Sequence, residues 1–139
     1  IHLQAAGKDI SDYALARVLC INVNSIQNPM QRHIEARTKL PVCNLYAPTE
    51  LGTAGLLYSC EAGRGQHIAE DYFYPELIAF GSDTPVTENN QMGELVITTL
   101  RAEAMPLIRY RTGQAVSLTD APCACGRTLA RVLTPFSAV

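Results

Sequence analysis

Apolar residues at the start of the chain fall into blocks that predict a strand, a helix and a second strand. Residues 17–23 form a largely apolar run, which is typical of a strand buried on both faces. Residues 28–39 follow with helical spacing and Pro29 at the first helical position, and Pro41 ends this region. Residues 42–46 are the next predicted strand. Because the crossover in such a unit is right-handed, we expect its two strands to be parallel in one sheet.

After residue 50 the pattern changes to short β-prone segments separated by turns rich in Gly, Ser, Asp and Asn. The predicted strands cover residues 55–60, 74–80, 93–98, 106–110 and 115–118. We therefore expect an α/β fold in two parts. Residues 1–50 would be the carboxyl-terminal part of a βαβ subdomain, and residues 51–139 a small, mostly antiparallel subdomain resembling a distorted β-barrel.

The composition indicates one modest core and limits the classes of partner. The chain has 139 residues, of which 47% are hydrophobic and 17% charged. A formal net charge of −2 gives no basic surface for nucleic acid or an anionic membrane. No apolar stretch approaches the roughly 20 residues of a membrane span, and the N-terminal residues lack the basic-then-apolar order of a signal peptide. We expect a cytoplasmic protein whose partners include neither nucleic acid nor membrane.

Polar side chains follow the two predicted parallel strands. Ligands of such units bind beyond the carboxyl ends of the strands, so residues 22–25 and 46–50 should face one crevice. Further along, residues 109–114 read Arg-Tyr-Arg-Thr-Gly-Gln. Guanidinium groups bind phosphate through paired hydrogen bonds, which suits a pocket for an anionic, polyhydroxylated ligand. The alternative is a hairpin whose arginines are solvated.

Residues 93–114, GELVITTLRAEAMPLIRYRTGQ, resemble the phenylacetate-CoA ligase branch of the adenylate-forming enzymes. Members of that branch look like GELVxTTLxxEAxPxIRYRTGD at this point. Residues 46–50, Tyr-Ala-Pro-Thr-Glu, resemble the Tyr-Gly-x-Thr-Glu motif of the same family. The resemblance implies an ATP-dependent acid-CoA ligase, which activates an aromatic carboxylate as an acyl-adenylate and transfers it to coenzyme A. Its cofactors would be ATP/AMP, magnesium and coenzyme A, with residues 1–50 in the AMP-binding subdomain.

The resemblance also implies roles for individual residues. Tyr46 would lie against the adenine of the nucleotide, and Ala47 and Pro48 would belong to the same nucleotide-binding site. Thr49 would donate a hydrogen bond to the α-phosphate and Glu50 would hold the magnesium ion, which makes these two the catalytic candidates. This assignment is chemically coherent, because a hard divalent cation prefers carboxylate oxygens and neutralises charge on the phosphates.

Three positions on the nucleotide side depart from the family pattern. Gln114 stands where the family has an aspartate that accepts from both ribose hydroxyls, and a glutamine offers one acceptor oxygen and no charge. Ala47 replaces a glycine, and Asn22 begins the loop where the family tends to have Gly-x-Glu-Pro beside the adenine. The alternative function is therefore a non-catalytic homologue with a degenerate nucleotide site. Such a homologue would bind or sequester an aromatic small molecule, for example as an antibiotic-resistance protein.

Two further parts that the family uses have no counterpart in this sequence. They are a phosphate loop rich in glycine, serine and threonine, and a mobile C-terminal domain with a catalytic lysine. The chain contains only Lys8 and Lys39, neither of which has a similar setting. We therefore expect a piece of a longer protein that works with the remainder of the same polypeptide and is inactive alone.

Cysteine and histidine residues in the second part predict a zinc site. Five cysteines at uneven spacing, without a secretory signal, argue against a disulfide framework. Cys60 and His67 are close in sequence, and Cys123 and Cys125 form a Cys-x-Cys knuckle followed by Gly126. Three thiolates and one imidazole make a closed, structural zinc set. A local redox pair of Cys123 and Cys125, or unconnected thiols, are the competing interpretations.

Overall fold

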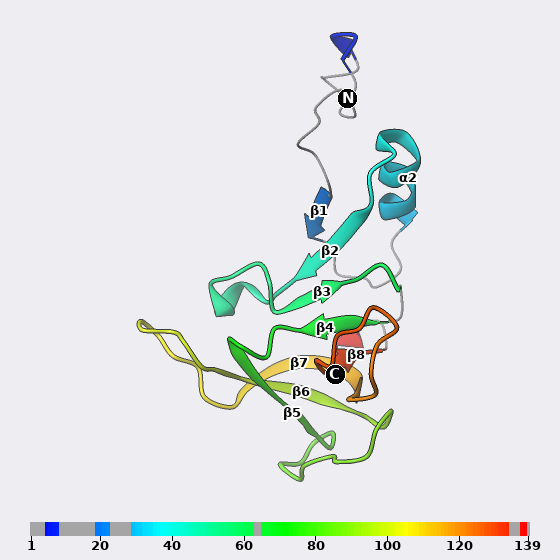
Figure 1. The fold of residues 1–139 in the computed structure, drawn as a ribbon. Coiled ribbons are helices and arrows are strands. Elements are labelled where there is room, and N and C mark those ends of the chain that lie inside the picture. The colour runs from blue at the N-terminus through cyan, green and yellow to red at the C-terminus, as the bar shows by residue number, and fades with distance from the viewer. Residues whose placement is uncertain (1–4, 9–18, 23–28, 63–64, 134–136, 139) are drawn as a thin grey trace.

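The computed structural model describes residues 5–8, 19–22, 29–62, 65–133 and 137–138. They form one mixed sheet with helix α2 beside its second strand (Figure 1). In chain order the elements are β1 (Leu19–Asn22), α2 (Pro29–Thr38), β2 (Val42–Tyr46), η2 (Thr49–Leu51), β3 (Leu57–Ser59), β4 (Gln66–Ile68), β5 (Phe73–Ile78), β6 (Met92–Thr99), β7 (Tyr110–Thr119), β8 (Arg131–Val132) and β9 (Ser137–Ala138).

The first strands form the predicted strand, helix, strand unit. β1 and β2 are parallel neighbours with Cys20 opposite Cys43, and α2 connects them in the chain. Gln31 and Glu35 lie one turn apart on α2, and both form hydrogen bonds with the backbone of Val42, the first residue of β2. The Gln31 amide donates to the carbonyl oxygen of Val42 (3.0 Å), and the Val42 amide donates to Glu35 (3.0 Å). Among the described residues, no helix is long and apolar enough to cross a membrane.

The sheet continues from this unit into the second part of the chain. Its strand order is β1-β2-β3-β4-β8-β7-β6-β5, with β9 paired to β7. Every pairing after β1–β2 is antiparallel. This confirms the α/β class with a mostly antiparallel second part. β1 and β5 are the two ends of the order, so the described strands form an open sheet and not a closed barrel. The division into residues 1–50 and 51–139 stays a prediction.

The strand pattern after β6 differs from the one expected. No separate strand forms at residues 106–109, since residues 100–109 are a loop that projects from the sheet between β6 and β7 (Figure 1). Tyr110, the last residue of the expected strand, is the first residue of β7. Met105 and Arg109 have φ angles of 55° and 51°, a left-handed backbone that interrupts a strand. β4, β8 and β9 were not expected from the pattern. They have only two or three residues each, too few to show an alternation.

The core lies between β2 and the strands of the second part. Residues 93–97 of β6 are all buried, so both faces of this strand are covered, which explains its unbroken apolar run. The buried core cluster consists of Tyr46, Leu56, Leu57, Ile68, Phe73, Leu77, Leu95, Ile97, Val116 and Val132. Tyr46 thus links the core to the end of β2, where the crevice described below begins.

Gly93 allows β5 and β6 to approach closely, and this generates a stability prediction. A Cβ atom at Gly93 would lie 2.6 Å from the carbonyl oxygen of Ile78 and 2.7 Å from Cγ of Leu77. We expect Gly93→Ala to lower the free energy of unfolding by about 1–3 kcal/mol, because overpacking forces the strands apart. Gly55→Ala is the matched control, since a Cβ there meets nothing within 4 Å. Urea unfolding that finds equal stabilities for the two variants would contradict the prediction.

Candidate functional site

A polar crevice of about 260 Å³ opens where β2 ends. Residues 46–50 line it from the end of β2, and Tyr110, Thr112 and Gln114 line it from β7. The two groups are far apart in the sequence. The structure therefore brings together, in one crevice, the two segments that the sequence motifs single out.

The first wall of the crevice is the turn after β2. Pro48, in an extended conformation with φ −58° and ψ 146°, leads directly into η2. Gly52 closes this turn with φ 62°, and its amide donates to the carbonyl oxygen of Thr49 (3.1 Å). The turn leaves the side chains of Thr49 and Glu50 exposed at the crevice.

The second wall depends on a register shift between β6 and β7. The pairing shifts between Glu94 and Val96, so that Leu95 alone spans residues 112–114 of β7. Gly113 takes a φ of 66°, which residues with a side chain rarely adopt. The resulting bulge places Thr112 and Gln114 at the crevice.

Hydrogen bonds within the bulge fix its conformation. The Thr112 hydroxyl donates to the carbonyl oxygen of Leu95 (2.8 Å). The amide of Gln114 in turn donates to the Thr112 hydroxyl oxygen (3.2 Å). Thr112 is therefore bound to the sheet, while the Gln114 side chain lies at the crevice as a neutral hydrogen-bonding group.

Two tyrosines and a carboxylate dominate the electrostatics of the crevice. Burial raises the pKa of Tyr110, and the nearby negative charge of Glu50, to which the phenol donates a hydrogen bond, raises it further. Burial and the same carboxylate also raise the pKa of Tyr46. Both phenols thus remain neutral donors at physiological pH, and Glu50 supplies the negative charge that a divalent cation would require.

The predicted nucleotide residues are brought together, with one exception. Residues 46–50 and Gln114 all line the crevice, whereas the side chain of Asn22 lies outside the described part of the structure. The sequence marks residues 109–114 as a candidate pocket segment and includes the Thr112 hydroxyl, which stands just before Gly113, but it gives Tyr110 no role of its own. The alternation of residues 110, 112 and 114 along one strand is the signal that could have identified Tyr110.

Neither Arg109, in the loop before β7, nor Arg111, on β7, lines the crevice. Arg109 forms an ion pair with Glu76 (3.2 Å), and Arg111 binds the buried carboxylate of Glu94 and also Asp83 (3.5 Å). The sequence allows two interpretations of these arginines, which are binding of an anionic ligand or exposure to solvent on a hairpin. Their positions do not support direct contact with an anionic ligand in this crevice. Arg111 is instead part of the sheet structure that carries the bulge.

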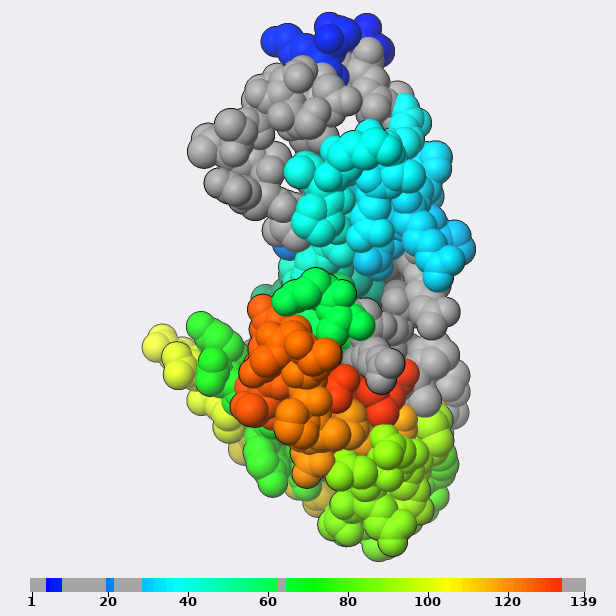
Figure 2. Space-filling view, turned by 45° about the vertical axis from the view of Figure 1, so that its right-hand side comes forward, coloured from blue at the N-terminus to red at the C-terminus, as the bar shows by residue number. Residues whose placement is uncertain are grey.

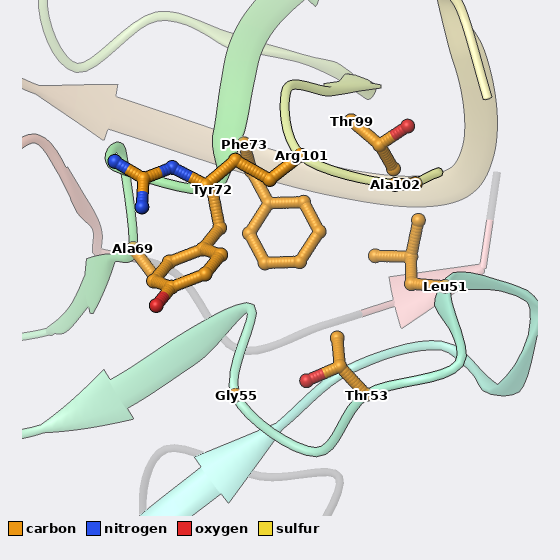
Figure 3. Close-up of a pocket in the computed structure, with 9 residues that line it drawn as sticks. All are labelled: Leu51, Thr53, Gly55, Ala69, Tyr72, Phe73, Thr99, Arg101 and Ala102. Atoms are coloured by element: carbon orange, nitrogen blue, oxygen red, sulfur yellow. The ribbon is translucent and has the colours of Figure 1, made fainter. Parts of the chain in front are cut away.

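A second pocket, of about 350 Å³, lies next to η2 (Figure 3). Leu51, Tyr72 and Phe73 give it an apolar, aromatic lining, and Thr53 lies opposite the Phe73 ring. At its edge, the Arg101 guanidinium lies over the Tyr72 ring, 5.1 Å from the ring centroid. Consecutive residues of the chain thus line the two cavities, Glu50 the polar crevice and Leu51 the aromatic pocket.

Four predicted metal ligands meet on the sheet. The side-chain donor atoms of Cys60, His67, Cys123 and Cys125 all lie within 4.8 Å of one another. Cys60 Sγ is 3.8 Å from Cys123 Sγ, and Cys125 Sγ is 3.4 Å from His67 Nε2. A tetrahedral zinc ion with ordinary bond lengths separates its ligand atoms by about 3.5–3.8 Å. The donor set is one that zinc prefers, the two short separations are close to those values, and all five cysteines have free thiols.

Three segments position this cluster. Cys60 follows β3, His67 lies on β4, and the knuckle at residues 123–126 closes with the Gly126 amide donating to the carbonyl oxygen of Cys123 (2.9 Å). In the space-filling view, the orange segment near residue 125 packs against the green turn near residue 60 (Figure 2). Tyr58 stacks on the His67 ring with centroids 5.5 Å apart.

Arg127 places a positive charge beside the thiols. Burial by itself would raise the pKa of Cys125, but hydrogen bonds from the backbone and side chain of Arg127, and from the neighbouring thiols, lower it to about 6. The guanidinium also lies over the Tyr58 ring, 6.0 Å from its centroid. Burial raises the pKa of Cys60 to about 11, so within the cluster Arg127 favours the thiolate form, in which cysteine binds a metal, at Cys125.

Curated relatives match most of this sequence, although no protein-family profile matches it. Phenylacetate-coenzyme A ligase of Thermus thermophilus is 43% identical over 90 residues, covering 64% of this chain and 20% of the relative. Phenylacetate-coenzyme A ligase of Escherichia coli is 33% identical over 127 residues, covering 91% of this chain and 29% of the relative. The chain thus spans less than a third of these relatives' length.

Solved structures show the same fold. An open conformation of 2-hydroxyisobutyryl-CoA ligase, in complex with 2-HIB-AMP and CoA, matches 88% of this chain with a TM-score of 0.75 and 21% identity. The same enzyme in the postadenylation state with 2-HIB-AMP matches 86% with a TM-score of 0.72. The chain covers 27% and 26% of these structures. The sequence relationship, together with the shared fold, identifies this chain as a phenylacetate-CoA ligase-like segment of an adenylate-forming enzyme.

Proposed function

We propose that this chain supplies part of the nucleotide site of an ATP-dependent acid-CoA ligase acting on an aromatic carboxylate. The observation that carries the proposal is the polar crevice, in which residues 46–50 meet Thr112 and Gln114. Relatives named phenylacetate-coenzyme A ligase suggest the substrate class, and a structural neighbour bound to an acyl-AMP and CoA suggests the cofactors.

The crevice offers suitable groups for the first half of such a reaction. The substrate carboxylate attacks the α-phosphorus of ATP and pyrophosphate leaves; the thiol of coenzyme A then attacks the acyl carbon and AMP leaves. The Thr49 hydroxyl would donate to the α-phosphate, Tyr46 would lie along the adenine with Ala47 and Pro48, and Gln114 would bind a ribose hydroxyl. Glu50 would hold a magnesium ion, which neutralises negative charge on the phosphates when bound.

We also propose that the cysteine and histidine cluster holds a structural zinc ion. Four protein ligands fill a tetrahedral site and leave no position for a catalytic water. The ligands come from the residue after β3, from β4 and from the knuckle before β8, so the ion would join segments that are far apart in sequence. A cytoplasmic location, in which thiols stay reduced, agrees with this role and remains a prediction.

The aromatic pocket favours one second candidate function. A homologue with a weakened nucleotide site could retain this pocket to bind or sequester an aromatic molecule. Tyr72, Phe73 and Leu51 supply the apolar lining that such a ligand requires, and the pocket does not depend on Gln114. The two functions differ in the ligand that the protein must bind. The ligase requires a nucleotide, whereas the binder requires only an aromatic compound.

A substitution at Gln114 tests the nucleotide assignment. We expect wild-type protein to bind AMP and Gln114→Asp to bind it about tenfold more tightly, because a charge-assisted hydrogen bond exceeds a neutral one by roughly 1.4 kcal/mol. Isothermal titration calorimetry measures both affinities. Gln91→Asp, which introduces the same change at an exposed site outside the crevice, should leave the affinity unchanged.

The same titrations separate the two functions. Binding of phenylacetate without any AMP binding, in both wild-type protein and Gln114→Asp, would reject the ligase function and support the aromatic binder. AMP binding that Thr49→Ala abolishes would support the ligase function.

The zinc proposal has its own test. We expect purified protein to contain about one zinc ion per chain, and Cys123→Ser to lose the ion and melt at a lower temperature, because a structural zinc site contributes to folding. Elemental analysis and thermal unfolding measure these quantities. Cys20→Ser, at an exposed cysteine outside the cluster, is the matched control and should keep the ion. Zinc-free wild-type protein with unchanged stability in Cys123→Ser would reject the site.

A further inference from the structure

Glu94 is a buried carboxylate inside the sheet that no motif role accounts for. It lies on β6 and is only 5% exposed. One carboxylate oxygen, Oε2, accepts hydrogen bonds from Nε of Arg111 (2.9 Å) and from Nη2 of the same guanidinium. The other oxygen, Oε1, accepts from the backbone amide of Gly113 (3.2 Å). Both oxygens are thus occupied by residues of β7.

These contacts fall where the regular pairing of β6 and β7 stops. A bulge leaves backbone groups of the longer strand without a ladder partner, and a buried amide without a partner is costly. The carboxylate of Glu94 takes the place of the missing acceptor for Gly113. Arg111 anchors the same carboxylate from the residue just before the bulge, so Glu94 binds the bulge at two points.

Glu94 itself does not line the polar crevice, whereas the bulge that it binds does so through Thr112 and Gln114. We propose that Glu94 is a positioning residue, which sets the conformation of residues 112–114 and thereby the geometry of the ribose side of the nucleotide site. The assignment of the crevice to a nucleotide rests on the proposed function. The claim that Glu94 fixes the bulge does not.

A neighbouring ion pair provides a matched control. Arg109 and Glu76 also join a carboxylate to an arginine beside β7, with Nε 3.2 Å from Oε2. This pair is partly exposed, and Glu76 makes no contact with the bulge. Glu76→Gln therefore removes a carboxylate paired with arginine without removing an acceptor from Gly113.

Amide hydrogen exchange, measured by NMR on the full chain, tests the structural half of the proposal. In Glu94→Gln we expect exchange at Gly113 and Gln114 to accelerate about tenfold or more, because the charged acceptor and its anchor are lost. Glu76→Gln should leave these rates unchanged. Unchanged rates in Glu94→Gln would overturn the proposal whether or not the protein binds nucleotide. If Glu94→Gln does not fold, Glu94→Asp, which keeps the charge but shortens the reach to Gly113, gives the same comparison.

Nucleotide discrimination tests the functional half. We expect Glu94→Gln to lose preference for AMP over 2′-deoxy-AMP, whereas a general loosening of the fold would weaken both ligands equally. Adding Gln114→Ala to Glu94→Gln should then cause no further loss of discrimination, although Gln114→Ala alone does. Full discrimination in Glu94→Gln would overturn the positioning role. If wild-type protein binds neither nucleotide, the proposed function fails, and the exchange rates alone decide whether Glu94 holds the bulge.

Discussion

The crevice depends on the side-chain hydrogen bonds that join β7 to β6 at the point where the register of their pairing shifts. Three residues of β7 occupy the space opposite one residue of β6, and this irregularity turns Thr112 and Gln114 toward the end of β2. A regular ladder would instead pair these residues with β6. The buried charge of Glu94 makes the irregular arrangement stable, because it binds both the arginine before the bulge and the amide within it.

A second constraint acts on the opposite part of the sheet. β3, β4 and β8 are short, and strands of two or three residues supply few ladder hydrogen bonds. The cysteine and histidine cluster draws together the end of β3, β4 and the knuckle before β8. A metal ion there would compensate for this weak pairing. Because β2 pairs with β3, a metal ion bound there would also stabilise β2, at whose end the crevice lies.

The sequence allows the main elements to be predicted wherever the periodic pattern is long. α2, β2 and β6 follow from helical spacing and apolar runs, and the cluster of Cys60, His67, Cys123 and Cys125 follows from residue type together with the Cys-x-Cys spacing. The crevice could be expected because the two motifs flank it, yet the meeting of Tyr110 and Thr112 with Glu50 required the fold. The role of Glu94 could not be read from the sequence. Its partners arise from a register shift that no local pattern encodes, and β8 and β9 are too short to leave a signal.

The proposed function requires that AMP occupy the polar crevice between the turn after β2 and the bulge of β7. The most direct measurement is the titration of isotope-labelled protein with AMP, followed by amide chemical shifts. We expect the largest shifts on Thr49, Glu50, Thr112 and Gln114, which line that crevice. Shifts confined to the aromatic pocket around Tyr72 and Arg101, or no shifts at all, would contradict it.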